Sequence, residues 1–114
     1  MEAMETARFY FELSNKSDFD NIEKLFTNGT VYISQTTGEY VGKKDIIAMQ
    51  RNFHGQFSSL NWRVTSVKEV KPGVILFDFD FVGKKPDGEV VKSSGLEYVS
   101  VDHGKIQKIE IINK

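Results

Sequence analysis

Cysteine is absent from this chain of 114 residues, and proline occurs only twice. Without cysteine the protein has no disulfide framework, no thiolate zinc site and no cysteine nucleophile. Neither sign of charge dominates, because 15 lysines and arginines are balanced by 16 aspartates and glutamates, for a formal net charge of −1. This balance argues against a nucleic-acid-binding protein that neutralises phosphates over a broad surface.

Long apolar runs are also missing. No run approaches the roughly 20 residues that span a bilayer. The first six residues, Met1 to Thr6, contain neither the basic segment nor the apolar stretch of a secretory signal peptide. We therefore expect a soluble, cytoplasmic protein that binds neither nucleic acid nor membranes. The length is typical of one domain, and we predict a single domain over residues 1–114.

Aromatic residues are plentiful, with 9 Phe, 4 Tyr and 1 Trp. Apolar residues at helical spacing predict three helices in the first half of the chain. The first helix closes at Asn15-Lys16, and the second begins at Ser17, with Asp20 as a weak capping box, and stops at Asn28-Gly29. The third begins at residues 42–45 and carries these inward-facing residues: Ile46, Ile47, Met49, Phe53 and Phe57.

Strands dominate the rest of the sequence. Residues 30–34 are rich in β-branched and aromatic residues and predict a short strand, whereas residues 36–40 predict a loop. Turn signals then separate four longer strands, at residues 60–71, 74–83, 89–101 and 106–113. The order αα-β-α-ββββ indicates an α+β fold in which three N-terminal helices cover one face of a curved, mainly antiparallel sheet.

The two-residue turn Pro72-Gly73 predicts the register of the first two long strands. It places Lys71 opposite Val74, and therefore Val70 opposite Ile75 and Val64 opposite Phe81. The face predicted to meet the helices consists of Trp62, Val64, Val70, Ile75, Phe77, Phe79 and Phe81. The other face is half polar, with Val67, Leu76 and Val82 among Arg63, Thr65, Glu69, Asp78 and Asp80.

The strand at 89–101 has no clear inner face, because Leu96 and Tyr98 point one way and Glu97, Val99 and Val101 the other. The five-residue connection at 84–88 is compatible with either parity. Glu97 therefore lies either on the outer surface or in the space covered by the helices.

Four segments together resemble the NTF2-like superfamily, in particular its SnoaL-like and ketosteroid-isomerase-like branch. They are Phe9-Tyr10-Phe11-Glu12-Leu13, Asp20-Asn21-Ile22-Glu23-Lys24-Leu25-Phe26 before Gly29-Thr30-Val31, Tyr40-Val41-Gly42-Lys43-Lys44-Asp45-Ile46, and Val101-Asp102-His103-Gly104-Lys105-Ile106. The resemblance covers essentially the whole chain. It implies a cone-shaped fold of the cystatin type, an apolar pocket between sheet and helices, and a homodimer formed through the outer sheet face.

The resemblance also allows the residues of the isomerase branch to be located. The position of its general-base Asp falls on Ile33. Because isoleucine cannot accept a proton, this disfavours ketosteroid-type proton abstraction. The position of its protonated acid falls on Leu96 or Glu97, and the ending Val101-Asp102-His103-Gly104-Lys105 favours Glu97 as inward-facing. The tyrosine of the first helix corresponds to Tyr10.

Candidate pocket residues are Tyr10, Tyr32, Phe53, Phe57, Trp62, Phe77, Phe79 and Glu97. Glu97 is also the one weak catalytic candidate. Each residue has a plainer interpretation: boundary tyrosines whose hydroxyls reach water, phenylalanines that fill the core, and an exposed strand glutamate.

Other polar residues are weaker candidates. His54 fits a surface or pocket-rim position, and His103 lies in a hairpin turn. Two isolated histidines do not indicate a metal, and no cofactor is expected. Asp78 and Asp80 share a strand face opposite the aromatic face, where a dimer surface is the better interpretation than a catalytic pair.

Three functional hypotheses follow. The first is binding of a small apolar molecule in the pocket, with an isomerase, cyclase or hydrolase activity of Glu97 and Tyr10 or Tyr32 as its enzymatic form. The second is a non-catalytic adaptor that binds another protein through its sheet face. The third is a plain homodimeric domain whose cavity is filled by phenylalanines.

Overall fold

A computed structural model describes residues 1–114. The chain forms helices α1 (Ala3–Asn15), α2 (Phe19–Glu23) and α3 (Lys43–His54) and strands β1 (Val31–Ser34), β2 (Gly38–Val41), β3 (Ser59–Lys71), β4 (Val74–Lys84), β5 (Val90–Asp102) and β6 (Lys105–Asn113). The six strands form one sheet in the order β2-β1-β6-β5-β4-β3, in which only β1 and β6 run parallel. The predicted α+β arrangement is confirmed.

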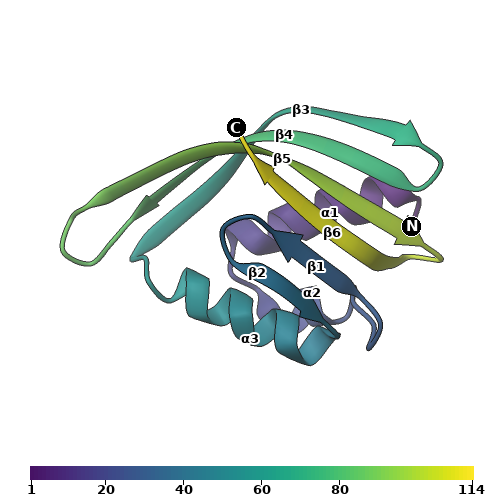
Figure 1. Ribbon diagram of the computed structural model, residues 1–114, viewed down its shortest axis with the longest axis horizontal. Coiled ribbons are helices and arrows are strands. Elements are labelled where there is room, and N and C mark those ends of the chain that lie inside the picture. Colours follow the sequence, from purple (N-terminus) through teal and green to yellow (C-terminus); the bar gives the residue numbers. More distant parts are fainter.

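The sheet is strongly curved, and the helices lie on its inner side (Figure 1). Helix α1 packs across β3, β4, β5 and β6, while α3 packs against α2 and β2. The core joins α1 to the sheet, and the rings of Phe11 and Phe77 are 4.2 Å apart between centroids. None of the three helices has the length and hydrophobicity of a transmembrane segment.

The N-terminal helices differ in detail from the sequence prediction. Asp18, not Ser17, caps α2, and its side chain accepts a hydrogen bond from the backbone N–H of Asn21. Helix α2 ends at Glu23, well before the stop predicted at Asn28-Gly29. Ser17 instead takes a left-handed conformation with φ of 53°, which separates α1 from α2. Helix α3 likewise ends at His54, so Phe57 lies beyond it.

The segment predicted as a loop at residues 36–40 contains a sixth strand. Residues Gly38 to Val41 pair with β1, and Tyr32 lies opposite Tyr40. Short polar segments of this kind have little strand propensity of their own. Pairing with β1 supplies the hydrogen bonds that keep this segment extended.

Two bulges in β3 change the register predicted from the Pro72-Gly73 turn. Lys71 does lie opposite Val74, but Glu69 lies opposite Ile75, and Val64 lies opposite Phe79. A bulge adds one unpaired residue and inverts the alternation of faces beyond it. Val67 therefore packs against the core, and Val70 is 44% exposed, the reverse of the prediction.

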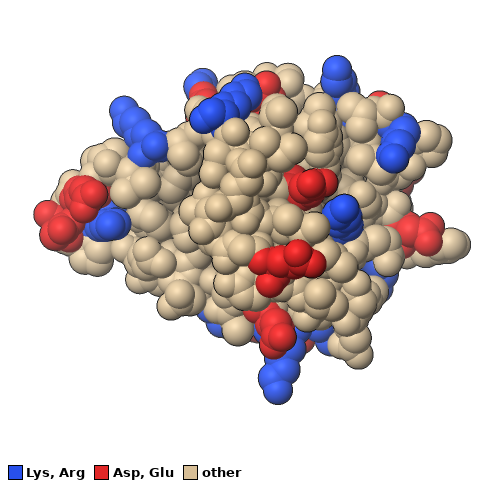
Figure 2. All heavy atoms as spheres, in the orientation of Figure 1, with Lys and Arg blue, Asp and Glu red and all other residues tan.

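The second bulge restores the alternation, so that Trp62 and Val64 face inward as predicted. On β4, Ile75, Phe77, Phe79 and Phe81 are all buried, which confirms their predicted inner face. Charged residues of both signs are interspersed over the face of the molecule in Figure 2, with broad uncharged areas between them.

Candidate functional site

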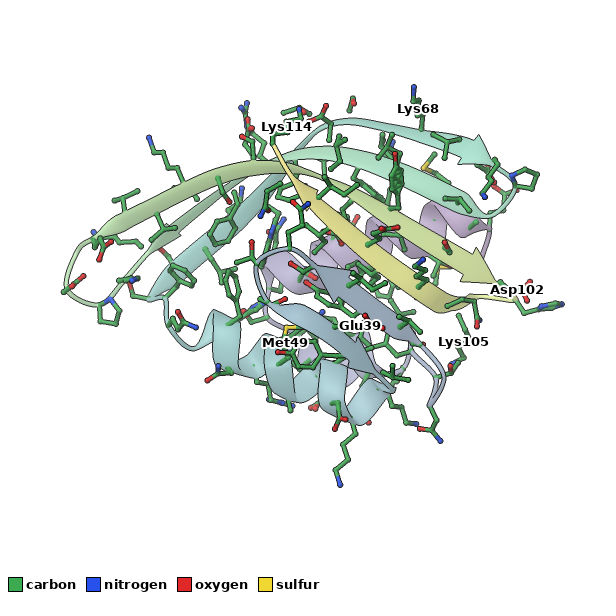
Figure 3. All side chains as sticks on the ribbon, in the orientation of Figure 1. Glu39, Met49, Lys68, Asp102, Lys105 and Lys114 are labelled. Atoms are coloured by element: carbon green, nitrogen blue, oxygen red, sulfur yellow. The ribbon has the colours of Figure 1, made fainter.

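A cavity of about 110 Å³ lies between α1, α3 and the inner face of the sheet. Its wall combines nine hydrophobic residues, most of them aromatic, with nine polar ones. The lining residues are Tyr10, Phe11, Ser14, Tyr32, Ser34, Thr36, Thr37, Met49, Gln50, Phe53, His54, Trp62, Phe79, Phe81, Ser93, Glu97, Ile111 and Asn113. In Figure 3, Met49 marks the side of α3 that faces the sheet, whereas Lys68 on β3 points away from the molecule.

Glu97 reaches the cavity because of the register of β5. It lies opposite Phe77 of β4 and Ile111 of β6, and residues 95, 97, 99 and 101 of β5 all face the helices. Glu97 is only 3% exposed. The sequence did not decide which alternate residues of β5 face the helices. The structure shows that these residues include Glu97, whose carboxyl group therefore lies in the cavity.

The environment of Glu97 favours its protonated form. Burial raises the pKa of the Glu97 carboxyl to about 8, and no hydrogen bond or positive charge offsets this effect. At neutral pH the group is therefore mostly a neutral carboxylic acid, able to donate a hydrogen bond as well as accept one.

Tyr10 and Gln50 connect α1 to α3 at the cavity wall. The side-chain amide of Gln50 donates a hydrogen bond of 2.8 Å to the phenol oxygen of Tyr10. Oε1 of Gln50 is buried and has no hydrogen-bond partner. Burial, and then the charge of Glu97, raise the pKa of the Tyr10 phenol well above its usual range, so that it remains a neutral donor.

Strand β1 contributes Tyr32 and Ser34, which are its two buried residues. Ile33, onto which the general-base position of the isomerase branch falls, lies between them on the opposite side of the strand. Neither inward residue is a carboxylate, so β1 carries no general base of the expected kind. Burial and the charge of Glu97 raise the pKa of the Tyr32 phenol.

The turn between β1 and β2 adds Thr37 to the cavity wall. Ser34 Oγ accepts hydrogen bonds from the backbone N–H groups of Thr36 and Thr37, and the carbonyl of Thr37 accepts one from the Tyr40 hydroxyl. These contacts fix the turn through its backbone. The Thr37 hydroxyl itself is buried without a partner.

His54 lies at the C-terminal end of α3 and lines the cavity. Of the two positions expected for it, surface or pocket rim, the structure shows the pocket rim. Its Nδ1 is 2.8 Å from the Ser17 hydroxyl, and its ring packs against Phe19 and Trp62. Burial lowers the pKa of the His54 imidazole to about 4, so the ring is neutral at neutral pH.

The structure places the predicted aromatic residues in two groups. Phe53, Trp62 and Phe79 line the cavity, together with Phe81. Phe57 and Phe77, also predicted as pocket residues, do not line it. Phe57 packs against Phe53 and Phe81 at the end of the cluster, and Phe77 lies in the core against Phe11.

Gln50 and Thr37 were not among the predicted site residues. For Gln50 a signal exists, because it follows Ile46 and Ile47 at helical spacing and precedes Phe53 by three residues. Its neighbours on the same helical face are buried, so Gln50 had to be an inward polar residue. For Thr37 no such signal exists, since its burial depends on the turn being folded against the sheet.

The remaining polar candidates lie outside the cavity. Asp80 contacts Arg63 and Ser94 at 2.7 Å each, and these hydrogen bonds lower the pKa of the Asp80 carboxyl. Asp78 pairs with Lys114. His103 lies in the turn between β5 and β6, beside Asp102. Nowhere do three or more His, Asp or Glu side chains converge as metal ligands would.

Comparisons with known proteins agree with this architecture. The family model described as a SnoaL-like domain matches residues 7–109. No curated protein matches the sequence.

Among solved structures, a proposed SnoaL-like polyketide cyclase from Shewanella putrefaciens has a TM-score of 0.86 at 11% identity and covers 97% of this chain and 88% of its own. An LEH-like epoxide hydrolase from M. tuberculosis has a TM-score of 0.86 at 13% identity, over 98% of this chain and 82% of its own. An NTF2-like protein of unknown function from Exiguobacterium has a TM-score of 0.83 at 18% identity, over 96% and 98%. These likenesses establish the NTF2-like fold.

Proposed function

The chain belongs to the SnoaL-like domain family, and we propose that it binds a small, largely apolar molecule in the cavity around Glu97. Structurally similar proteins include a hydrolase and a proposed cyclase as well as proteins of unknown function, so family membership alone does not name a ligand or a reaction.

The observation that carries this proposal is the placement of Glu97. An unpartnered carboxyl group buried among aromatic rings costs stability in any fold. A phenylalanine or methionine there would pack the core without that cost. Polar groups that converge beside aromatic walls in a cavity are typical of small-molecule sites.

Trp62 gives a direct test of binding, because it is the only tryptophan and lines the cavity. We expect toluene to change its fluorescence in a saturable manner, and calorimetry to report the same dissociation constant. Ser14→Leu places a larger side chain in the cavity from α1 and should abolish the response. Glu12→Leu places the same leucine on the exposed side of α1 and should leave it unchanged. A non-saturable response would contradict the proposal.

An enzymatic function is a second proposal, supported by two titratable groups with opposite shifts in one cavity. The pKa of Glu97 is raised to about 8 and that of His54 lowered to about 4. A neutral acid and a neutral imidazole together meet the requirements of general acid and base, with Tyr10 or Tyr32 as hydrogen-bond donors. In an isomerase or hydrolase screen, Glu97→Gln should remove any turnover while ligand binding persists. Unchanged turnover would exclude the acid–base role.

A homodimer through the outer sheet face is proposed separately, and the same face would serve a protein-binding adaptor. Leu76, Leu96, Tyr98 and Ile112 are half-buried there, beside exposed Val70. Sedimentation of the purified protein should give a dimer, and Tyr98→Lys should shift it to monomer without changing the cavity. A strict monomer would contradict the dimer.

A further inference from the structure

We propose that the occupant of the cavity is an uncharged single-ring molecule carrying a hydroxyl group, that is, a ligand of the phenol class. The inference rests on the proposed ligand-binding function and specifies the chemistry of the ligand. It follows from three features of the cavity: its charge, its unpartnered polar atoms and its size.

The charge of the wall excludes anions. None of the 18 lining residues is a lysine or arginine. A carboxylate or phosphate buried there would have no positive partner and would lie near Glu97. Desolvation of such an unpaired charge costs far more than the apolar contacts return.

The state of Glu97 disfavours cations. Its carboxyl group is mostly protonated at neutral pH, because burial raises its pKa to about 8. An ammonium ligand would require the acid to ionise first. The other ionisable groups on the wall, namely Tyr10, Tyr32 and His54, are also neutral at this pH.

The unpartnered atoms require both a donor and an acceptor from the ligand. Gln50 is 5% exposed, its amide nitrogen is used by Tyr10, and its Oε1 remains as a buried acceptor. The phenol of Tyr10 receives that bond and keeps its own proton to donate. The protonated carboxyl of Glu97 is a second donor, and the Thr37 hydroxyl is also without a partner.

A hydroxyl group is the simplest group that meets both requirements, because it donates one hydrogen bond and accepts others. A carbonyl accepts only and would leave Oε1 of Gln50 unpaired. An ammonium donates only and would leave the donors of Tyr10 and Glu97 unpaired. Each buried group left unpaired lowers affinity.

The size of the cavity limits the ligand to about one ring. Its volume is about 110 Å³. An apolar protein cavity of about 150 Å³ is known to take benzene, whereas drug-sized ligands need 300 Å³ or more. The rings of Phe53, Trp62, Phe79 and Phe81 provide flat apolar walls for such a molecule.

The test compares five single-ring probes at pH 7 by Trp62 fluorescence and calorimetry: toluene, phenol, acetophenone, benzylammonium and benzoate. We expect phenol to bind about tenfold more tightly than toluene, as one well-formed hydrogen bond in a buried site implies. Acetophenone, whose carbonyl can accept from Tyr10 or Glu97 but gives Oε1 of Gln50 no donor, should bind less tightly than phenol. The two ions should bind more weakly still. Equal affinities for phenol and toluene, or tightest binding by acetophenone or either ion, would overturn the inference while leaving the binding function intact. Failure of all five probes would overturn both.

Two variants test whether the preference for phenol over toluene depends on the unpartnered oxygens of Gln50 and Thr37. Gln50→Met and Thr37→Val each remove an unpartnered oxygen and should reduce the ratio of phenol to toluene affinity. Thr6→Val is the matched control, because the Thr6 hydroxyl is also buried and unpartnered but lies outside the cavity wall. An unchanged ratio in both cavity variants, with thermal unfolding showing that they are folded, would contradict the proposed contacts.

Discussion

The side-chain amide of Gln50 donates a hydrogen bond of 2.8 Å to the phenol oxygen of Tyr10, and this bond connects the two long helices at the wall of the cavity. Both residues are buried. Each helix therefore holds the polar group of the other in place, and removal of either partner breaks this buried hydrogen bond between the helices.

Tyr10→Phe should destabilise the protein by about 1–3 kcal/mol, the cost of a buried polar group that loses its partner. The double variant Tyr10→Phe with Gln50→Met should recover most of that loss, because both polar groups are then gone. Urea unfolding of the two single variants and the double variant measures this difference. Additive losses would show that the bond contributes no coupling.

Glu97→Gln should remove a pH dependence of stability. The pKa of Glu97 rises from 4.5 to about 8 on folding, so the folded protein keeps a proton that the unfolded chain releases. This contribution is complete below pH 4.5 and is lost as pH rises through 8, with a slope of at most about 1.4 kcal/mol per pH unit. Urea unfolding between pH 6.5 and 8 should show a decline in the wild type and a flatter curve in the variant. Parallel curves would rule out a buried acid at this position.

His54→Phe should protect the protein at acid pH. Burial lowers the pKa of His54 from 6.5 to about 4 on folding, so the unfolded chain takes up a proton before the folded protein does. Its contribution to stability is present above pH 6.5 and is lost as pH falls through 4. The stability of the variant relative to the wild type should therefore increase as pH falls over this range, measured by thermal unfolding. A constant difference would contradict the prediction.

Gly83→Ala should cost about 1–3 kcal/mol, as overpacking of a filled core does. A Cβ atom at this position would lie 2.6 Å from Cδ1 of Phe57. In a Phe57→Ala background the ring is absent, and the cost of Gly83→Ala should largely disappear. Chemical unfolding of the four proteins in this cycle gives the coupling, and an equal cost in both backgrounds would count against the contact.

The bulges of β3 mark the limit of what strand alternation predicts. The inner faces of β4 and of the first part of β3 followed from the alternation of aromatic and polar residues, and Trp62 and Phe79 lie where it placed them. Between the bulges the faces are exchanged, so Val67 is inside and Val70 outside. No local sequence pattern predicts the extra residue of either bulge, because a bulge depends on the curvature of the whole sheet.

The pocket was predicted in part. The family resemblance, together with helical spacing and strand alternation, pointed to Tyr10, Tyr32, Phe53, Trp62 and Phe79, which line the cavity. Phe57 and Phe77 are equally apolar, yet they fill space instead of bordering it. The apolar character of a side chain predicts that it is buried. It does not predict whether another side chain or an open space lies beside it.

By itself, the sequence determined the class of fold, the order of the helices and long strands, and the concentration of aromatic rings between helices and sheet. These features depend on local propensity and periodicity, which act within a few residues. Only the tertiary structure decided that Glu97 faces inward, because the connection at 84–88 allows either parity and the pairing of β5 with β4 and β6 selects one. Many of the aromatic residues that are abundant in the sequence thus form the wall of a cavity around one buried carboxyl group, that of Glu97.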